Sequence, residues 1–262
     1  MAVATTVAAQ AVAAAQVLVP LYSWNSSCWP ELQQAATSNP TASFLAILNP
    51  NSGPTSDTSD PSMYCVPVLR QAVPNLTLVG YISTKYGERD AGEVVDEVNT
   101  YRKWATTNVS DGGVEGTAGI DGIFFDETPS FTDSTSGMDK YVTYSQTVRQ
   151  LFGSSSTVVY NPGTYTNEKL YGYASYVVAY EDRYAGFASA QLPTSTSLQQ
   201  KSAIMVHTLG TADLDSLVKE LVPTYGAVFV TDTSIDEEDV YARFGNDWPE
   251  FVADVVSASG SS

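Results

Sequence analysis

Short apolar runs, each bounded by turn-forming residues, recur along the whole chain. Runs of this kind are typical of strands that are buried on both faces, as in a parallel sheet covered by helices. We expect such strands at residues 16–22, 43–48, 76–82, 120–125, 157–160, 176–180, 203–206 and 227–230.

Between these strands, apolar residues recur at the spacing of an amphipathic helix. The clearest case is the set Leu214, Leu217, Val218 and Leu221, at positions i, i+3, i+4 and i+7. Similar patterns predict helices at 30–37, 64–73, 94–104, 138–152 and 251–256. Eight strands alternating with helices over roughly 240 residues predict a single (β/α)8 TIM-type barrel, which usually has about 250 residues. An open doubly wound sheet is the alternative, but the strand count and the lack of a phosphate-binding turn argue against it.

No linker and no internal repeat divides the chain, so we expect one catalytic domain at residues 16–256. The segment 1–15 is rich in Ala and Val but lacks Lys and Arg, and it is interpreted as a signal or pro-segment remnant or a disordered segment. The Ser/Gly-rich residues 257–262 are expected to form a disordered tail.

Polar or aromatic residues follow almost every predicted strand, whereas the strand beginnings show nothing comparable. The catalytic groups of barrels occupy the C-terminal ends of the strands, so these positions predict a functional face. The residues concerned are Tyr22, Trp24, Asn49, Ser83, Asp126, Glu127, Asn161, Glu181, Asp182, His207 and Asp232.

The acids Asp126 and Glu127 follow the fourth predicted strand, and Glu181 follows the sixth. Side chains at one level of a barrel come from alternate strands, so Asp126 or Glu127 can face the same layer as Glu181. Two backbones about 10 Å apart would then allow their carboxylates to approach to about 5–9 Å, the range that glycoside hydrolases use. Two alternatives stay open: the Asp126–Glu127 pair caps a loop and faces solvent, or Glu181 forms an ion pair with Arg183 or Lys85.

Charge and composition narrow the choice of partner. The chain has 29 acids and 12 bases, for a formal net charge of −17, and such a surface repels the phosphate backbone of nucleic acids. Low charge density with many Ser, Thr, Asn and Tyr residues favours an extracellular protein that handles neutral or cationic polymers. No apolar stretch approaches the length of a membrane span. Cys28 and Cys65 either close one loop or remain two buried thiols.

Other chemistries lack their motifs. Glycines 113, 116 and 119 follow a predicted helix and precede a strand, the wrong order for a dinucleotide-binding turn, and they are interpreted as a flexible loop. No G-x-S-x-G nucleophile elbow occurs. One His and two distant Cys do not make a zinc site. We therefore expect no metal and no cofactor.

Four segments resemble the spherulin-4 (spherulation-specific) family. They are GIFFDE at 122–127, VAYE at 178–181, VPLY at 19–22 and ILNP at 47–50, and the similarity spans residues 16 to about 256. The resemblance implies a (β/α)8 fold, a fungal or slime-mould secreted or cell-surface location, and endo-acting hydrolysis of α-1,4-linked N-acetylgalactosamine or galactosamine polymers. The essential acids of the family fall on Asp126, Glu127 and Glu181. Family members carry a signal peptide, which this N-terminus does not clearly show.

Together, the sequence patterns and this resemblance lead us to expect a monomeric, secreted or cell-surface glycoside hydrolase, and the resemblance implies that its partner is an amino-sugar polysaccharide of the galactosaminogalactan type. Asp126 or Glu127 would act as nucleophile or stabiliser and Glu181 as acid/base, unless the N-acetyl carbonyl of the substrate itself attacks. Expected sugar contacts are Tyr22, Trp24, Asn49, Tyr81, Asn161, Tyr180, His207 and Asp232, and all of these except Asp232 have a core-packing alternative. The alternative function is a non-catalytic glycan-binding protein of a cell wall or spore surface.

Overall fold

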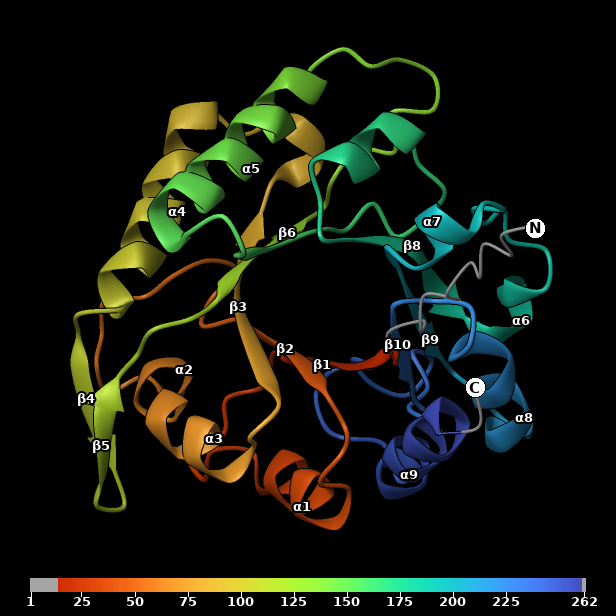
Figure 1. The fold of residues 1–262 in the computed structure, drawn as a ribbon, viewed down its shortest axis with the longest axis horizontal. Helices are drawn as coiled ribbons and strands as arrows, with labels where there is room; N and C mark the ends of the chain where they lie inside the picture. The colour runs from red at the N-terminus through yellow and green to blue at the C-terminus, as the bar shows by residue number, and fades with distance from the viewer. Residues whose placement is uncertain (1–13, 261–262) are drawn as a thin grey trace, which may run out of the picture.

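Eight parallel strands close into a barrel in the computed structural model, which describes residues 14–260 (Figure 1). The order around the barrel is β1-β10-β9-β8-β7-β6-β3-β2. The (β/α)8 prediction is confirmed, and the predicted strands match the observed ones closely. Their bounds are β1 Gln16–Leu21, β2 Phe44–Leu48, β3 Leu76–Ser83, β6 Gly122–Asp126, β7 Thr157–Tyr160, β8 Tyr176–Arg183, β9 Ser202–His207 and β10 Ala227–Val230.

Helices surround the barrel, although not evenly. The α-helices are α1 Pro30–Ser38, α2 Pro61–Tyr64, α3 Val66–Ala72, α4 Ala91–Trp104, α5 Met138–Phe152, α6 Tyr184–Phe187, α7 Thr196–Gln199, α8 Leu214–Leu221 and α9 Trp248–Ser259. Only the 3₁₀ helix η2 (Glu168–Gly172) joins β7 to β8, and only the short α6 and α7 join β8 to β9. A second 3₁₀ helix, η1 (Lys85–Gly87), follows β3.

The strands are apolar on both faces because each face meets a separate core. One cluster fills the barrel interior and includes Leu18, Ile47, Val79, Phe124 and Met205. A larger cluster lies between the strands and the helices. Burying this apolar surface on both sides is what stabilises the closed sheet, at roughly 25 cal/mol per Å².

A β-hairpin occupies the segment that we interpreted as a flexible loop, and that interpretation is wrong. Strands β4 (Asn108–Asp111) and β5 (Val114–Thr117) pair antiparallel. Gly112 and Gly113 between them have φ of 54° and 84°, the positive values that a two-residue hairpin turn needs. The hairpin lies beside α2 and α3 in Figure 1.

The predicted ends of the domain differ in outcome. The predicted disordered tail is wrong for residues 257–259, which continue the last turn of α9. Of the Ala-rich segment 1–15, all but residues 14 and 15 lie outside the described residues. Within residues 14–260, no helix has the length and apolar character needed to cross a bilayer.

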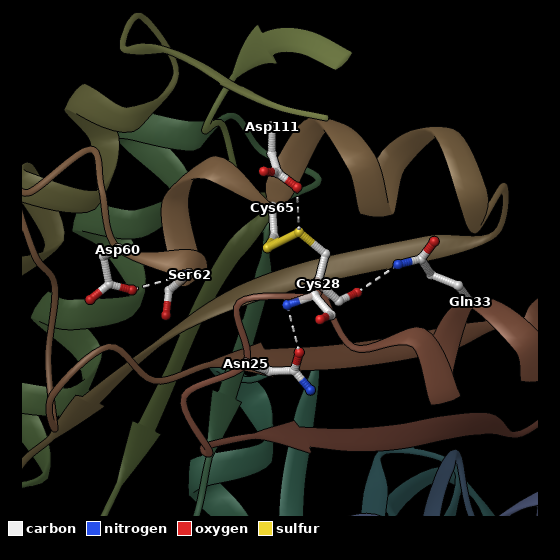
Figure 2. Close-up of a disulfide and its surroundings, with 8 residues drawn as sticks. Asn25, Cys28, Gln33, Asp60, Ser62, Cys65 and Asp111 are labelled. Carbon is white, nitrogen blue, oxygen red and sulfur yellow. Dashed lines mark hydrogen bonds between the residues drawn. A yellow bond between two sulfur atoms is a disulfide. The ribbon is translucent and has the colours of Figure 1, made fainter. Parts of the chain in front are cut away.

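A disulfide joins the β1–α1 connection to the junction of α2 and α3 (Figure 2). It links Cys28 to Cys65, 37 positions apart, so the loop-closing alternative for the two cysteines is the one observed. The side chain of Gln33 donates to the carbonyl of Cys28 at 2.7 Å, and a carboxylate oxygen of Asp111 lies 3.5 Å from the Cys28 sulfur. The bond thus fixes the start of α1 against α3 and the hairpin.

Candidate active site

An open cavity of about 710 Å³ lies at the C-terminal ends of the barrel strands. This volume is within the range of about 300–1,000 Å³ that is usual for small-molecule sites. Acids dominate its wall, and the residues of the described chain that line it include no Lys or Arg. They are Tyr86, Asp126, Glu127, Asn161, Pro162, Gly163, Glu181, Asp182, His207, Ile235, Asp239, Val240 and Tyr241.

Strand β6 directs Asp126 into the barrel. Alternate side chains of a strand share a face, and Phe124, two residues earlier, belongs to the interior cluster. The hydroxyl of Tyr81 on β3 donates to one Asp126 oxygen at 2.5 Å, and Asn161 Nδ2 donates to the other at 2.7 Å. Asp126 is therefore held by neutral donors from the two neighbouring strands.

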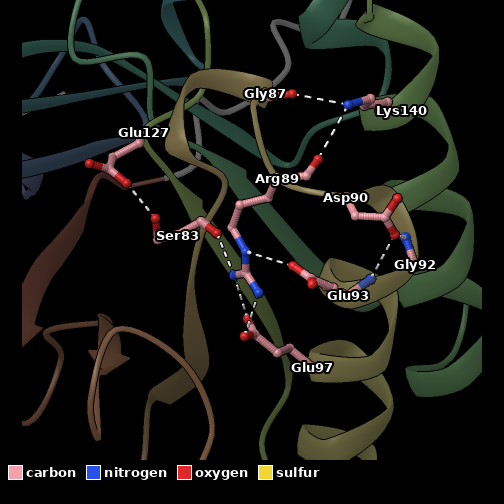
Figure 3. A network of polar contacts seen from close by, with 9 residues as sticks. All are labelled: Ser83, Gly87, Arg89, Asp90, Gly92, Glu93, Glu97, Glu127 and Lys140. Carbon is pink, nitrogen blue, oxygen red and sulfur yellow. Dashed lines mark hydrogen bonds and ion pairs between the residues drawn. The ribbon is translucent and has the colours of Figure 1, made fainter.

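Glu127 faces the same cavity although it follows Asp126 directly. In a regular strand two consecutive side chains point to opposite faces. Glu127 has a φ of 51°, a left-handed conformation that is strained for a residue with a side chain and that turns it back towards the cavity. The hydroxyl of Ser83, at the end of β3, donates to Glu127 Oε2 (Figure 3). The alternative of a solvent-facing capping pair is wrong for these two acids.

A β-bulge in β8 directs Glu181 inward. Val178 and Tyr180 pair with consecutive residues of β9, so Ala179 is an extra residue in the ladder. Because a bulge shifts the side-chain alternation by one, Tyr180 lies outside the barrel and Glu181 lies inside, opposite Met205 of the interior cluster.

Glu181 does not form the ion pair that we considered as an alternative. Arg183 contacts Asp236 at 2.5 Å instead. Glu181 accepts hydrogen bonds from Asn161 Nδ2 at 2.6 Å and from the hydroxyl of Tyr241. The partners of Glu181 are thus uncharged, like those of Asp126.

Asn161 holds Asp126 and Glu181 together. Its Nδ2 donates to both carboxylates, at 2.7 and 2.6 Å, while its Oδ1 accepts from the backbone N–H of Gly163 at 2.9 Å. The nearest oxygens of the two acids are therefore separated by no more than the sum of the first two distances. That limit is close to the separation of about 5–5.5 Å in retaining glycosidases and below the about 6.5–9.5 Å of inverting ones.

Burial raises the pKa values of both bridged acids. Desolvation is the main cause for Asp126, and the hydrogen bonds from Tyr81 and Asn161 offset part of it. Desolvation also leads for Glu181, and the negative charge of Asp126 raises its pKa further. Because two close carboxylates in a buried site resist ionising together, the pair retains a proton to higher pH than isolated carboxyls do.

Three tyrosines form the base of the site beneath these acids. The Tyr22 ring packs edge-on against Tyr81 at 5.5 Å and against Tyr241 at 5.2 Å between centroids. Burial raises the pKa of Tyr22, and the charges of Asp126 and Glu181 raise it further. The tyrosines therefore stay protonated and can act as hydrogen-bond donors.

The predicted sugar contacts divide into two groups. Asn161 and His207 line the cavity, whereas Tyr22 and Tyr81 do not line it but pack with the barrel-interior cluster next to the acids, where Tyr81 donates to Asp126. Trp24, Asn49, Tyr180 and Asp232 are not part of the cavity wall: Trp24 is 69% exposed, Asn49 accepts from the Ser52 amide, Tyr180 donates to the Arg183 carbonyl, and Asp232 accepts from the amide and side chain of Asn246.

His207 combines the two roles that its position left open. It lines the cavity, yet only 6% of it is exposed, and Nδ1 lies 2.8 Å from the Thr208 hydroxyl. Burial lowers the pKa of His207, although the charge of Asp182 opposes that effect. The imidazole is therefore neutral near pH 7.

The sequence of this chain also matches a family of known proteins. The model of the family described as spherulation-specific family 4 matches residues 16–255. The chain belongs to this family. The family resemblance found in the sequence is thereby confirmed over almost the whole barrel.

Two known proteins are similar to this chain over most of its length. Spherulin-4 of Physarum polycephalum is 26% identical over 228 residues, which cover 83% of this chain and 63% of that protein. The chain thus spans less than two thirds of the length of that relative. The crystal structure of Aspergillus clavatus Sph3 in complex with GalNAc is similar with a TM-score of 0.78 and 27% identity, covering 93% of this chain and 98% of that one.

Several wall residues of this family member escaped the sequence reasoning. Tyr241, Asp239 and Ile235 come from the connection between β10 and α9, and Tyr86 comes from η1. None of them stands at a strand end. Among residues 14–260, no group of three or more His, Cys, Asp or Glu side chains is arranged to hold a metal ion.

Proposed function

We propose that this protein is an endo-acting glycoside hydrolase that cleaves α-1,4-linked N-acetylgalactosamine or galactosamine polymers. The observation that carries the proposal is the convergence of Asp126, Glu127 and Glu181 on one open cavity. The similarity to Sph3, a protein crystallised with GalNAc, supports an amino sugar as the bound unit.

The hydrogen bonds favour a division of roles within the bridged pair. Asp126 accepts from Tyr81, from Asn161 and from the backbone of Glu127, whereas Glu181 accepts from Asn161 and Tyr241. The additional donor favours the anion at Asp126, so Asp126 stays ionised and stabilises the oxocarbenium-like transition state. Glu181 keeps the shared proton and delivers it to the leaving sugar oxygen.

Glu127 is the third member of the machinery. Its carboxylate is fixed by Ser83 and lies next to Asp126 on the same wall. From there it either attacks the anomeric carbon or orients an N-acetyl group whose own carbonyl attacks. Either route is a double displacement at the anomeric carbon, so both give net retention of configuration.

The acidic wall also supports a partly deacetylated, cationic substrate. Five acids line the cavity, and its described lining residues include no Lys or Arg, so a protonated amino group would be attracted there. Binding of such a polymer should weaken as salt is added. Binding that is insensitive to ionic strength would contradict this choice of substrate.

Secretion fits the same function. The Cys28–Cys65 disulfide is of the kind that persists in oxidising compartments such as the extracellular space. We therefore propose a secreted or cell-surface monomer that acts on an extracellular polysaccharide.

Release of reducing ends from purified galactosaminogalactan tests the proposal. Glu127→Gln and Glu181→Gln should each lower turnover by about 10²–10⁴-fold with an unchanged circular dichroism spectrum. Glu220→Gln, which alters an exposed carboxylate on α8, is the matched control and should retain full activity. Near-normal turnover in both active-site variants would overturn the scheme, and binding without any turnover by the wild type would indicate a glycan-binding protein instead.

A further inference from the structure

An exposed aromatic ring stands at the rim of the acidic cavity. Among the described residues, four large hydrophobic side chains are exposed: Trp24, Tyr86, Tyr184 and Ile235. Two of them, Tyr86 and Ile235, line this one cavity. Exposing an apolar side chain is unfavourable, so its repetition at the edge of a site indicates a binding role.

The backbone that presents Tyr86 is strained. Lys85, Tyr86 and Gly87 have φ values of 46°, 54° and 83°, so three consecutive residues adopt the left-handed region. That region is unfavourable for Lys and Tyr because of contacts with their Cβ atoms. Such strain persists only where the surroundings impose it, and it is concentrated at functional sites.

The surroundings do impose this conformation, as Figure 3 shows for the flanking residues. The Tyr86 amide donates to the Glu127 carbonyl at 2.6 Å. Lys140 Nζ donates to the carbonyls of Gly87 at 3.0 Å and Arg89 at 3.3 Å. The Arg89 side chain in turn donates to the Ser83 carbonyl at 2.8 Å. The loop is therefore fixed on both sides of Tyr86.

Because this loop is already fixed, a ligand can bind to its exposed ring without the entropy cost of ordering the loop. The Tyr86 side chain is 65% exposed and does not pack into the core. It nevertheless lines the same cavity as Glu127, Asp126 and Glu181, and desolvation and the charges of these acids raise its pKa. The face of an aromatic ring carries partial negative charge and attracts the C–H face of a sugar ring.

From these observations we infer that Tyr86 is a stacking platform for a second sugar residue, next to the one held by the acids. The inference rests on the proposed function and adds a subsite to it. The cavity then takes at least two consecutive units of a polymer of neutral or cationic sugars. An enzyme that binds two or more consecutive units of a polymer is suited to cleaving within the chain.

Calorimetric titration in a Glu181→Gln background separates binding from turnover. The probes are GalNAc monosaccharide and an α-1,4-linked N-acetylgalactosamine hexasaccharide. Tyr86→Ala should weaken hexasaccharide binding about tenfold and leave monosaccharide binding unchanged, because only the longer ligand reaches the ring. Tyr86→Phe should bind both as the parent does. Tyr184→Ala, another exposed aromatic residue outside the cavity wall, is the control and should change neither affinity.

Each other result overturns the inference in its own way. Hexasaccharide affinity that is unchanged in Tyr86→Ala removes the platform but leaves hydrolysis by the wild type intact. Equal losses in the Phe and Ala variants would assign the effect to the hydroxyl and not to the ring. If the Glu181→Gln parent bound neither the monosaccharide nor the hexasaccharide, both this inference and the proposed substrate would be overturned.

Discussion

Replacing Tyr241 by Phe tests the proposed protonation of Glu181 with the smallest possible change. The hydroxyl of Tyr241 donates to Glu181 Oε1, and its ring packs against Tyr22 and Phe229. Phenylalanine keeps the ring and its packing and removes only the donor. The variant should therefore fold normally, with a circular dichroism spectrum like that of the wild type.

The expected effect is a rise in the pKa of Glu181. Tyr241 favours the ionised form of Glu181, and it opposes the desolvation and the charge of Asp126 that raise the pKa. A hydrogen bond to a charged group is worth about 1.5–3 kcal/mol. At 1.36 kcal/mol for one pKa unit, its loss should raise the pKa of Glu181 by about 1–2 units.

The assay is the pH dependence of kcat/KM for polymer cleavage. If Glu181 is the general acid, activity falls at high pH as it loses its proton, and the basic limb of the profile should move about 1–2 units upward in Tyr241→Phe. Tyr225→Phe, a change in the core outside the barrel, should leave both limbs in place. A basic limb that stays fixed or moves downward would refute the assignment of the proton to Glu181.

Three further predictions concern stability and positioning. Asp247 is half-buried, with its carboxylate oxygens shielded from solvent near Asp232, and desolvation raises its pKa to about 7. Folding therefore favours its protonated form, and stability is lost as the pH rises from about 4 through 7. Asp247→Asn should therefore gain about 2 kcal/mol over the wild type between pH 4 and 8 after solvent screening, or about 4 °C in Tm, and a pH-independent difference by calorimetry would contradict this. Replacing Cys28 and Cys65 by Ser, 37 positions apart, should cost about 3–4 kcal/mol and lower Tm visibly, whereas an unchanged Tm would show that the bond is dispensable. Asn161→Ala should lower kcat/KM at least about tenfold and raise both limbs of the pH profile, and fixed limbs would exclude a bridging role.

The strands were predictable because burial on both faces requires a short, continuous run of apolar residues. Phe124 faces the barrel interior and Phe125 faces the helices, and each needs an apolar side chain for its own core. The same reasoning placed Asp126 and Glu181 at the edge where the cavity lies, since polar residues at the ends of such strands are otherwise costly. The fold and the location of the site thus follow from local patterns.

Side-chain direction was not predictable in the same way. A single extra residue, Ala179, decides whether Tyr180 or Glu181 points inward, and nothing in an apolar run marks a bulge. No pattern in the sequence indicates the left-handed conformation of Glu127 either. Tyr241 is 60 positions from Glu181, so their contact is visible only once the barrel closes. The β4–β5 hairpin, by contrast, had a usable sign in the Gly-Gly pair at 112–113, a common hairpin turn.

The shared amide of Asn161 has a consequence for how variants of this protein should be interpreted. Because one nitrogen serves two carboxylates, altering either acid changes the environment of the other, and their individual effects on rate will not sum. The double variant with Asp126→Asn and Glu181→Gln should be scarcely slower than the slower of the two single variants. Adding the rate effects of the two single substitutions would therefore overestimate what the pair contributes together.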